Sequence, residues 1–147
     1  MPSIWNDTDR GDLVRRAWMI TPDHTAKWGT FNAAAMLAHL ADSARMALGD
    51  LPVQAKAPKI LKWAPVRYLV IHKLPMPKGA PTAPELLARC STADLQHEQQ
   101  ALQSLFDALP RRATLAATHP AFGAMTRDDW GVLIHKHTDH HLRQFGV

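Results

Sequence analysis

The sequence has a single cysteine, Cys90, and no apolar run of membrane-spanning length. One cysteine excludes a framework of intramolecular disulfides and fits a reducing compartment. The longest mostly apolar stretches, at 33–41 and 66–71, fall far short of the roughly 20 residues that a membrane helix needs. No basic segment followed by an apolar one stands near the N-terminus, so no secretion signal is predicted. We therefore expect a soluble, cytoplasmic protein without a membrane partner.

The sequence also has no large excess of positive or negative charge. The 147 residues include 17 Lys or Arg and 13 Asp or Glu, a net charge of +4. The basic residues are spread along the chain, and the region 56–78 is the nearest thing to a patch. A net charge of this size is ordinary for a soluble domain, so no nucleic-acid partner is expected. The length and the 46% of hydrophobic residues predict one domain over residues 1–147 with a core of its own.

Apolar residues recur at helical spacing in four segments. The predicted helices span about 7–20, 30–48, 92–109 and 126–145. Thr30 is the expected N-cap of the second helix and Gly49 its C-terminal cap. Pro110 closes the third helix, and Thr126 with Asp129 resembles a capping box at the start of the fourth.

The segment between the second and third helices holds seven of the eleven prolines, over residues 51–84, and predicts a long irregular crossover. Within it, residues 59–73 favour a short helix that is kinked or started at Pro65. The alternative is a strand at 66–71, but a lone strand would have no partner. The fold class is therefore all-α, a four-helix bundle in which the long crossover allows neighbouring helices to run parallel.

The clearest chemical signal lies in the histidines, of which the sequence has nine. On a helical wheel of the last segment, His137 and His141 fall beside Trp130 and Ile134 on the face expected to enter the core. The opposite side carries four polar residues, His135, Lys136, Asp139 and Arg143. Imidazoles at positions i and i+4 project side by side, so one metal ion can contact both.

Two ligands hold a metal ion poorly, so a third is expected from another helix. His39 is the best candidate, because it lies in the middle of the second helix at the edge of its apolar face. The other candidates lie in loops or in polar surroundings, and they are His24, His72, His97 and His119. His140 is expected at the border of the site and His135 in solvent. The competing interpretation of any single histidine is a hydrogen-bonded core residue without a metal ion.

Several stretches of the chain together resemble the DinB-like superfamily. They are Trp28-Gly29, the segment PKGAPTAPE at 77–85, His119-Pro120-Ala121-Phe122-Gly123, Asp129-Trp130-Gly131 and the segment HTDHHLRQFG at 137–146. The histidine of Leu37-Ala38-His39-Leu40 precedes them in the middle of a helix. The C-terminal stretch is the specific part, and the resemblance spans nearly the whole chain.

This resemblance implies a four-helix bundle of up-down-down-up order, often dimeric, that holds a metal ion with three histidines. Matched residue by residue, the implied ligands are His39, His137 and His141. Where wider members of the superfamily end in His-Arg-Gly-Gln, this chain reads His141-Leu142-Arg143-Gln144. This difference leaves the three ligand histidines in place, but it means that the substrate of better-studied members is not transferred to this chain. Better-studied members resemble hydrolases or transferases that use low-molecular-weight thiols.

Three neutral imidazoles leave one position open on a zinc, nickel, iron or manganese ion. The first functional hypothesis is therefore a metal-dependent hydrolase or thiol transferase that acts on a small molecule. The second is a non-catalytic metal-binding or dimeric interaction module. No general base is evident: Asp42 faces away from the core on the helical wheel, and Cys90 has no histidine placed beside it. Gln144 is expected either to hydrogen-bond within the site or to serve as a structural amide.

Overall fold

The structure is a computed structural model that describes residues 1–54 and 56–147. Its four longer helices are α1 (Asp7–Met19), α2 (Ala33–Leu48), α4 (Leu95–Ala108) and α5 (Arg127–Gln144). The only strands in the described part are the two-residue β1 (Thr118–His119) and β2 (Gly123–Ala124), which pair antiparallel. The chain is thus mostly helical, as the all-α prediction requires.

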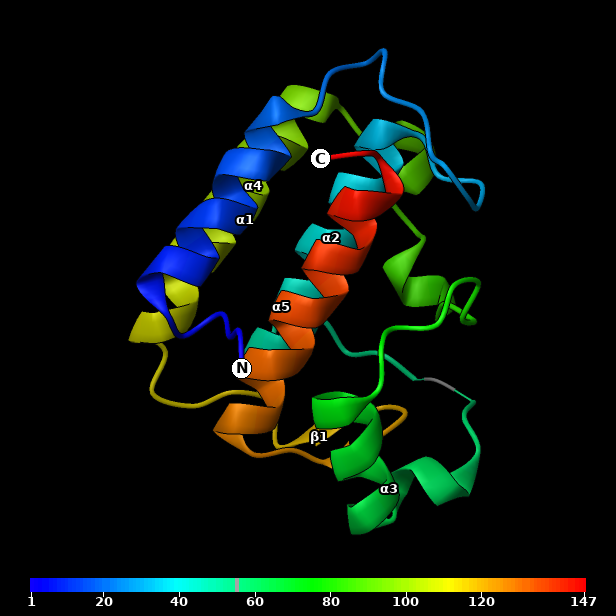
Figure 1. The fold of residues 1–147 in the computed structure, drawn as a ribbon, viewed down its shortest axis with the longest axis vertical. Coiled ribbons are helices and arrows are strands. Elements are labelled where there is room, and N and C mark those ends of the chain that lie inside the picture. The colour runs from blue at the N-terminus through cyan, green and yellow to red at the C-terminus, as the bar shows by residue number, and fades with distance from the viewer. Residues whose placement is uncertain (55) are drawn as a thin grey trace.

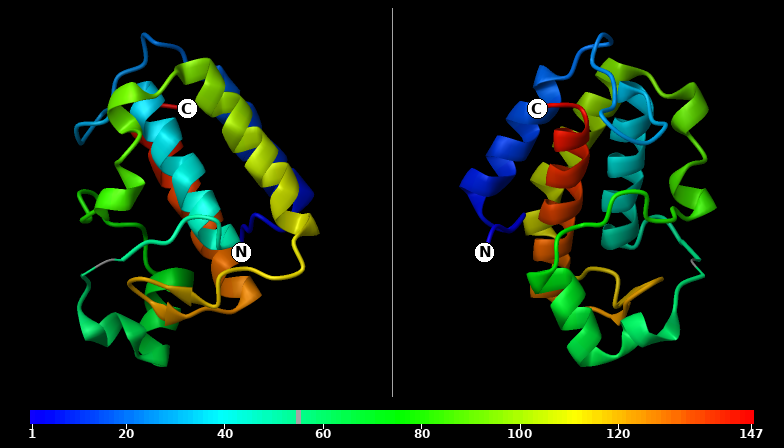
Figure 2. Two further views of the ribbon diagram at one scale, coloured as in Figure 1. Left: turned by 180° about the vertical axis from the view of Figure 1, so that it is seen from behind. Right: turned by 45° about the vertical axis from the view of Figure 1, so that its right-hand side comes forward.

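The four longer helices lie side by side. Helix α2 packs against α4 and α5, and α1 packs against the same two helices. In Figures 1 and 2, α1 and α5 run in one direction and α2 and α4 in the other. Large side chains buried between them form the core, including Leu13, Leu37, Leu102, Phe106 and Trp130. Among the described residues, no helix is both long and apolar enough to cross a bilayer.

The helix ends follow local chemistry. Gly49 takes a left-handed φ of 82° after α2, as its predicted capping role requires. Thr126 and Asp129 form the predicted capping box of α5. The prediction of Thr30 as the N-cap of α2 is wrong, because the Asn32 side chain accepts a hydrogen bond of 2.8 Å from the Ala35 N–H instead. The amide oxygen of Asn is among the strongest N-caps, so the helix begins two residues later than a Thr30 cap would place it.

The segment between α2 and α4 forms several short helical pieces. At 59–73, where the prediction favoured a helix, they are η1 (Lys59–Lys62), α3 (Ala64–Tyr68) and η2 (Leu69–Lys73). Two more, η3 (Pro84–Leu86) and η4 (Cys90–Thr92), follow outside that range. A further piece, η5 (Leu109–Arg111), follows α4. Pro65 lies in the first turn of α3, where its missing N–H is not needed. The strand alternative at 66–71 is therefore wrong.

The polar side of α5 is only partly turned to solvent: Arg143 is exposed, whereas Lys136 and Asp139 are covered by neighbouring segments. The Lys136 ammonium donates to the carbonyl oxygens of Val70, Ile71 and Leu74, at 2.7, 2.6 and 2.8 Å. Asp139 accepts a hydrogen bond of 2.8 Å from Arg16 on α1. This side of α5 thus fastens the end of η2 and helix α1 to the body of the protein.

A second correction concerns Asp42, which the helical wheel placed away from the core. Its side chain is buried, and it accepts hydrogen bonds from the guanidinium of Arg89 and from Arg45. Arg89 also donates to the buried carboxylate of Glu98 at 2.6 Å. Because both carboxylates lower the energy of the charged guanidinium, the pKa of Arg89 rises above its ordinary value. This triad joins α2, the crossover and α4.

Gly131, in the second turn of α5, lies directly under the N-terminal segment. The Ile4 N–H donates to its carbonyl at 3.0 Å, and a Cβ on this residue would overlap the Trp5 indole and the Ser3 hydroxyl. The indole cannot easily move, because its Nε1–H donates to the Arg127 carbonyl at 2.8 Å. Only glycine allows the segment to approach α5 this closely.

We expect Gly131→Ala to lower the free energy of unfolding by about 1–3 kcal/mol through overpacking. Gly11→Ala is the matched control, because Gly11 is also inside a helix and a Cβ there has no atom within 4 Å. It should raise the free energy of unfolding by about 0.5–1 kcal/mol through helix propensity. Urea denaturation of both variants measures the difference. An equal rise in both would contradict the close packing at Gly131.

Candidate metal centre

Three histidines from two helices meet in the interior. His39 comes from α2, while His137 and His141 lie one turn apart on α5. Their ring centroids are 4.9 Å (His39 to His137), 5.0 Å (His39 to His141) and 4.8 Å (His137 to His141) apart. One ring nitrogen from each lies within 4.8 Å of the others, close enough for all three to bind one metal ion. The structure thus brings together the three residues singled out from the sequence.

Hydrogen bonds on the outer side of two rings orient them. The Nδ1 of His39 lies 3.2 Å from the Leu86 carbonyl oxygen, and the Nδ1 of His141 lies 2.7 Å from the Gln144 Oε1. Both partners are acceptors, because the Gln144 Nε2 donates to the Trp28 carbonyl at 2.6 Å. Each Nδ1 therefore carries the proton, and each Nε2 keeps its lone pair for a ligand.

The third ring completes the arrangement. The Nε2 atoms of His137 and His39 lie 3.0 Å apart. Since His39 accepts at this atom, the proton between them belongs to His137. To bind a metal ion through Nε2, His137 would carry its proton on Nδ1 instead of Nε2.

The surroundings favour the neutral form of all three rings. Burial lowers the pKa of His39, and it lowers the pKa of His137 well below the ordinary value. Burial also lowers the pKa of His141 to about 4, although the hydrogen bond to Gln144 opposes the shift. Neutral imidazole is the form that binds a metal ion. The site is therefore ready to act as a ligand set at neutral pH without losing protons to solvent.

Aromatic side chains border the site. The Phe31 ring stacks on His39 with a centroid distance of 5.3 Å and lies 5.8 Å from His141. Next to it, the edge of the Trp28 ring meets His140 at 5.4 Å. His140 itself lies 5.2 Å from His141, at the border where the sequence placed it. Sequence reasoning missed Phe31 and the Leu86 carbonyl, because neither carries a spacing signal.

The other histidines lie outside the cluster. His24 bonds to Thr21, His97 is exposed, and His72 Nε2 lies 2.7 Å from Asp129. The interpretation of His135 as solvated is wrong, because it is half-buried and burial lowers its pKa. Burial also lowers the pKa of His119 to about 4.

Cys90 takes no part in the cluster. Its thiol donates to the Ala35 carbonyl oxygen at 3.4 Å, and burial raises its pKa. A thiol that holds its proton is a poor nucleophile and a poor ligand. The structure thus leaves the three imidazoles as the ligand set.

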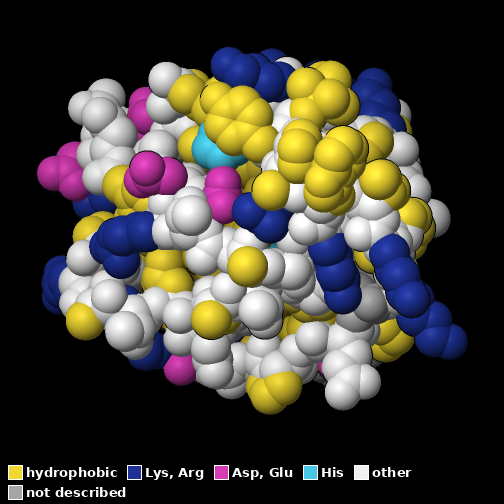
Figure 3. Space-filling model, turned by 90° about the horizontal axis from the view of Figure 1, so that it is seen from below, with side chains coloured by type: hydrophobic (Ala, Val, Ile, Leu, Met, Phe, Trp, Pro, Cys, Tyr) yellow, Lys and Arg dark blue, Asp and Glu magenta, His cyan; other side chains and the backbone are white. Residues whose placement is uncertain are grey.

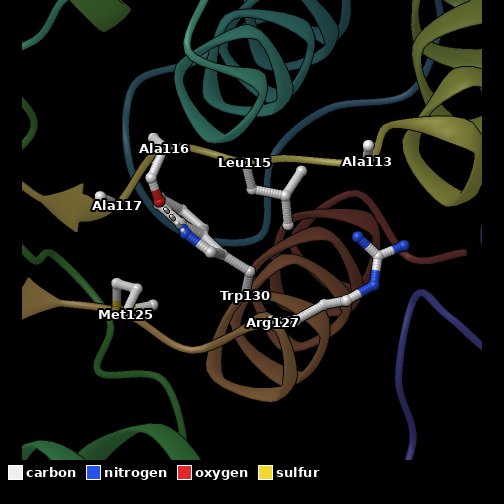
Figure 4. Close-up of a pocket in the computed structure, with 7 residues that line it drawn as sticks. All are labelled: Ala113, Leu115, Ala116, Ala117, Met125, Arg127 and Trp130. Carbon is white, nitrogen blue, oxygen red and sulfur yellow. Dashed lines mark hydrogen bonds between the residues drawn. The ribbon is translucent and has the colours of Figure 1, made fainter.

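A small pocket of about 120 Å³ lies at the other end of α5, beside Trp130. Figure 4 shows Trp130 reaching to the segment before β1 that carries Ala116, whose carbonyl accepts from the indole Nε1 at 2.8 Å. Most of the lining is aliphatic, and none of the three clustered histidines contributes to it. This pocket is therefore separate from the metal centre.

Comparison with known proteins adds the family. A protein family of unknown function, DUF1569, matches residues 7–146. The chain belongs to the DUF1569 family. The matched range contains His39, His137, His141 and Gln144, so the whole cluster belongs to the family domain. No curated protein and no solved structure matches the chain.

Because Gln144 holds the His141 ring, its amide should matter for metal affinity. We expect Gln144→Leu to weaken zinc binding by about 10–100-fold, as for other residues that orient a metal ligand. Gln103→Leu is the matched control. Among the described residues, the amide of this α4 residue only accepts a hydrogen bond from the exposed Trp18 indole on α1, and neither helix carries a member of the histidine cluster. Competition with a chromophoric chelator measures both affinities. Equal affinities in the two variants would mean that Gln144 does not orient the ligand.

Proposed function

We propose that this protein binds one divalent metal ion through His39, His137 and His141. The observation that carries the proposal is the meeting of their ring nitrogens within 4.8 Å, from helices far apart in the sequence. The residues fit such an ion, because Leu86 and Gln144 hold the rings of His39 and His141 with Nε2 free to act as a ligand. Burial keeps the third ring, His137, neutral. Imidazole ligands suit zinc and nickel best, with iron or manganese as the next choices.

The proposed activity is that of a metal-dependent hydrolase or thiol transferase acting on a small molecule, and the proposed substrate is a low-molecular-weight thiol. When bound, the ion would supply the Lewis acidity that makes a water or a thiol nucleophilic near neutral pH. Gln144 holds the His141 ring in place, while Phe31 and Trp28 form an apolar border that limits access of water. Asp42 is not available as a general base, because Arg89 and Arg45 occupy its oxygens.

The fold belongs to the same proposal. The opposed directions of the helix pairs in Figure 1 support a four-helix bundle of up-down-down-up order, as in the DinB-like superfamily. By the same resemblance we propose a homodimer. The single cysteine supports a reducing, cytoplasmic setting.

A second candidate is a non-catalytic site in which the metal ion stabilises the fold. The observation in its favour is that His39 is only 3% exposed and has Phe31 stacked on it. Cobalt(II) distinguishes the two candidates, because its visible spectrum reports its coordination. A spectral change on adding 2-mercaptoethanol would show an open ligand position and support the enzyme. An unchanged spectrum would support the structural role.

The test of metal binding itself is the metal content of the purified protein, grown with added zinc and nickel and measured by plasma mass spectrometry. We expect about one ion per chain in the wild type, and none in the double variant His137→Ala/His141→Ala. The midpoint temperature of thermal unfolding should rise when the ion is added back to the wild type, and not when it is added to the double variant. A wild-type protein that emerges free of metal, with unchanged thermal stability on re-addition, would sink the proposal.

A further inference from the structure

The crossover between α2 and α4 has a charge of one sign. Between Asp50 and Glu85 the sequence contains no Asp or Glu. It contains six basic residues, Lys56, Lys59, Lys62, Arg67, Lys73 and Lys78. These residues are the nearest thing to a basic patch in the sequence, and the short helices η1, α3 and η2 within the segment lie together at the lower end of Figure 1.

The same segment exposes large apolar side chains. Among the described residues, five of the nine exposed large hydrophobic side chains lie in it: Ile60, Trp63, Tyr68, Leu69 and Leu74. Trp63 is 60% exposed and Ile60 55%. We call these five side chains, with Lys59, Lys62, Arg67 and Lys73, the apolar–basic face. Figure 3 shows this end of the molecule, where hydrophobic side chains gather and Lys and Arg side chains lie around them.

The backbone of the face is fastened to the helices behind it. Ile71 is buried on the inner side of η2, and Lys136 binds three carbonyl oxygens at the end of that helix. His72 bonds to Asp129 on α5 at 2.7 Å. The inner side of this short helix is thus satisfied, while the outer side chains remain exposed. These side chains are therefore exposed although the backbone that carries them is held in place.

The chemistry of the face matches that of a membrane surface. Trp and Tyr favour the boundary between headgroups and acyl chains, because each has an apolar body and a polar tip. Aliphatic side chains such as Ile60 and Leu69 gain free energy by entering the same boundary. Lys and Arg around them attract anionic headgroups. We propose that the apolar–basic face docks this protein on the surface of an anionic lipid bilayer.

Two other occupants fit less well. In a symmetric contact with a second copy, each face would meet itself, and the basic residues would repel one another. A single-stranded nucleic acid would use Trp63 and Tyr68 for stacking and the basic residues for its phosphates. It would leave the aliphatic Ile60, Leu69 and Leu74 without a role. Of these three occupants, a lipid surface is the one that uses the aromatic, aliphatic and basic side chains together.

Sedimentation of the full-length protein with vesicles tests the proposal. We expect the wild type to bind vesicles of equal parts phosphatidylglycerol and phosphatidylcholine, and not vesicles of phosphatidylcholine alone. High salt should weaken the binding, since the headgroup attraction is electrostatic. The double variant Trp63→Ser/Tyr68→Ser and the charge-reversed Lys59→Glu/Lys62→Glu should each bind at least about tenfold more weakly.

Matched controls change the same residue types elsewhere. Trp18→Ser removes an exposed tryptophan of α1, and Arg111→Glu reverses an exposed arginine of η5. Both should bind vesicles within about twofold of the wild type. All altered side chains are exposed, and unchanged thermal unfolding will confirm that the variants fold. The assay is repeated with a chelator, because the proposal does not depend on the metal centre.

Three results would overturn the inference. The first is a wild type that stays in the supernatant with anionic vesicles. The second is equal loss of binding in the control variants, which would indicate general charge attraction. The third is a face whose variants abolish binding of a single-stranded oligonucleotide or self-association while vesicle binding is unchanged.

Discussion

Replacement of Arg89 by methionine is expected to lower the free energy of unfolding by about 3 kcal/mol. The guanidinium is the main partner of two carboxylates, Asp42 and Glu98, whose side chains are 5% and 1% exposed. Without Arg89, Glu98 loses its only ion-pair partner in the described residues, while Asp42 keeps Arg45. An uncompensated carboxylate in the interior costs several kcal/mol. The partial exposure of Arg89, 37%, admits water and places the effect at the lower end of the usual range.

The matched control is Arg112→Met, which breaks the ion pair between Arg112 and Asp50. Both members of that pair are about half exposed, so its loss should cost less than about 1 kcal/mol. Urea denaturation gives both values. A second variant, Arg89→Met with Asp42→Asn and Glu98→Gln, removes the buried charges together and should regain part of the stability. Equal effects of Arg89→Met and Arg112→Met would contradict the role of burial.

Replacement of His39 by alanine is expected to weaken zinc binding by at least about 100-fold, or roughly 2.7 kcal/mol. The two histidines left on α5 lie in the i, i+4 arrangement that binds a metal ion by itself only weakly. Removal of His39 also takes away the ring that Leu86 holds in its ligating tautomer. A competition titration against a chromophoric chelator measures the loss.

His97→Ala is the control for this change, because His97 is an exposed histidine of α4 away from the cluster. It should bind zinc like the wild type. Since His39 is also a core residue, the free energy of unfolding of each variant is measured once with a chelator and once with added zinc. If His39→Ala loses the same free energy of unfolding in both conditions, the role of His39 is purely structural. An affinity equal to that of the wild type would remove His39 from the ligand set.

The candidate site was predictable only in part. The pair His137 and His141 follows from one helix, because positions i and i+4 of any helix share a face. His39 was only the best of several candidates by its place in the second helix, and the resemblance then implied it as a ligand. Residues 98 positions apart are joined only by the packing of α2 on α5, which no local pattern shows. Phe31 and the Leu86 carbonyl could not be found, because a loop aromatic and a backbone oxygen carry no pattern.

The errors about the charged residues Asp42 and Lys136 share one cause. The helical wheel ranks the sides of a helix by their own polarity, and it cannot show what covers a polar side. Asp42 is buried because the crossover returns Arg89 to it, and Lys136 is covered because η2 ends over it. In both cases a charged group enters the interior together with its partners, which a single segment does not reveal.

The sequence by itself determined the lengths of the helices and most of their ends, because capping residues, proline and a period of 3.6 act within a few residues. It also determined the low cysteine content, which leaves imidazole rather than thiolate as the expected ligand type. The tertiary structure alone decided which histidines meet, which charges are buried and which apolar side chains stay exposed at residues 60–74. These outcomes depend on contacts between segments far apart in the chain, and a local pattern contains no information about them.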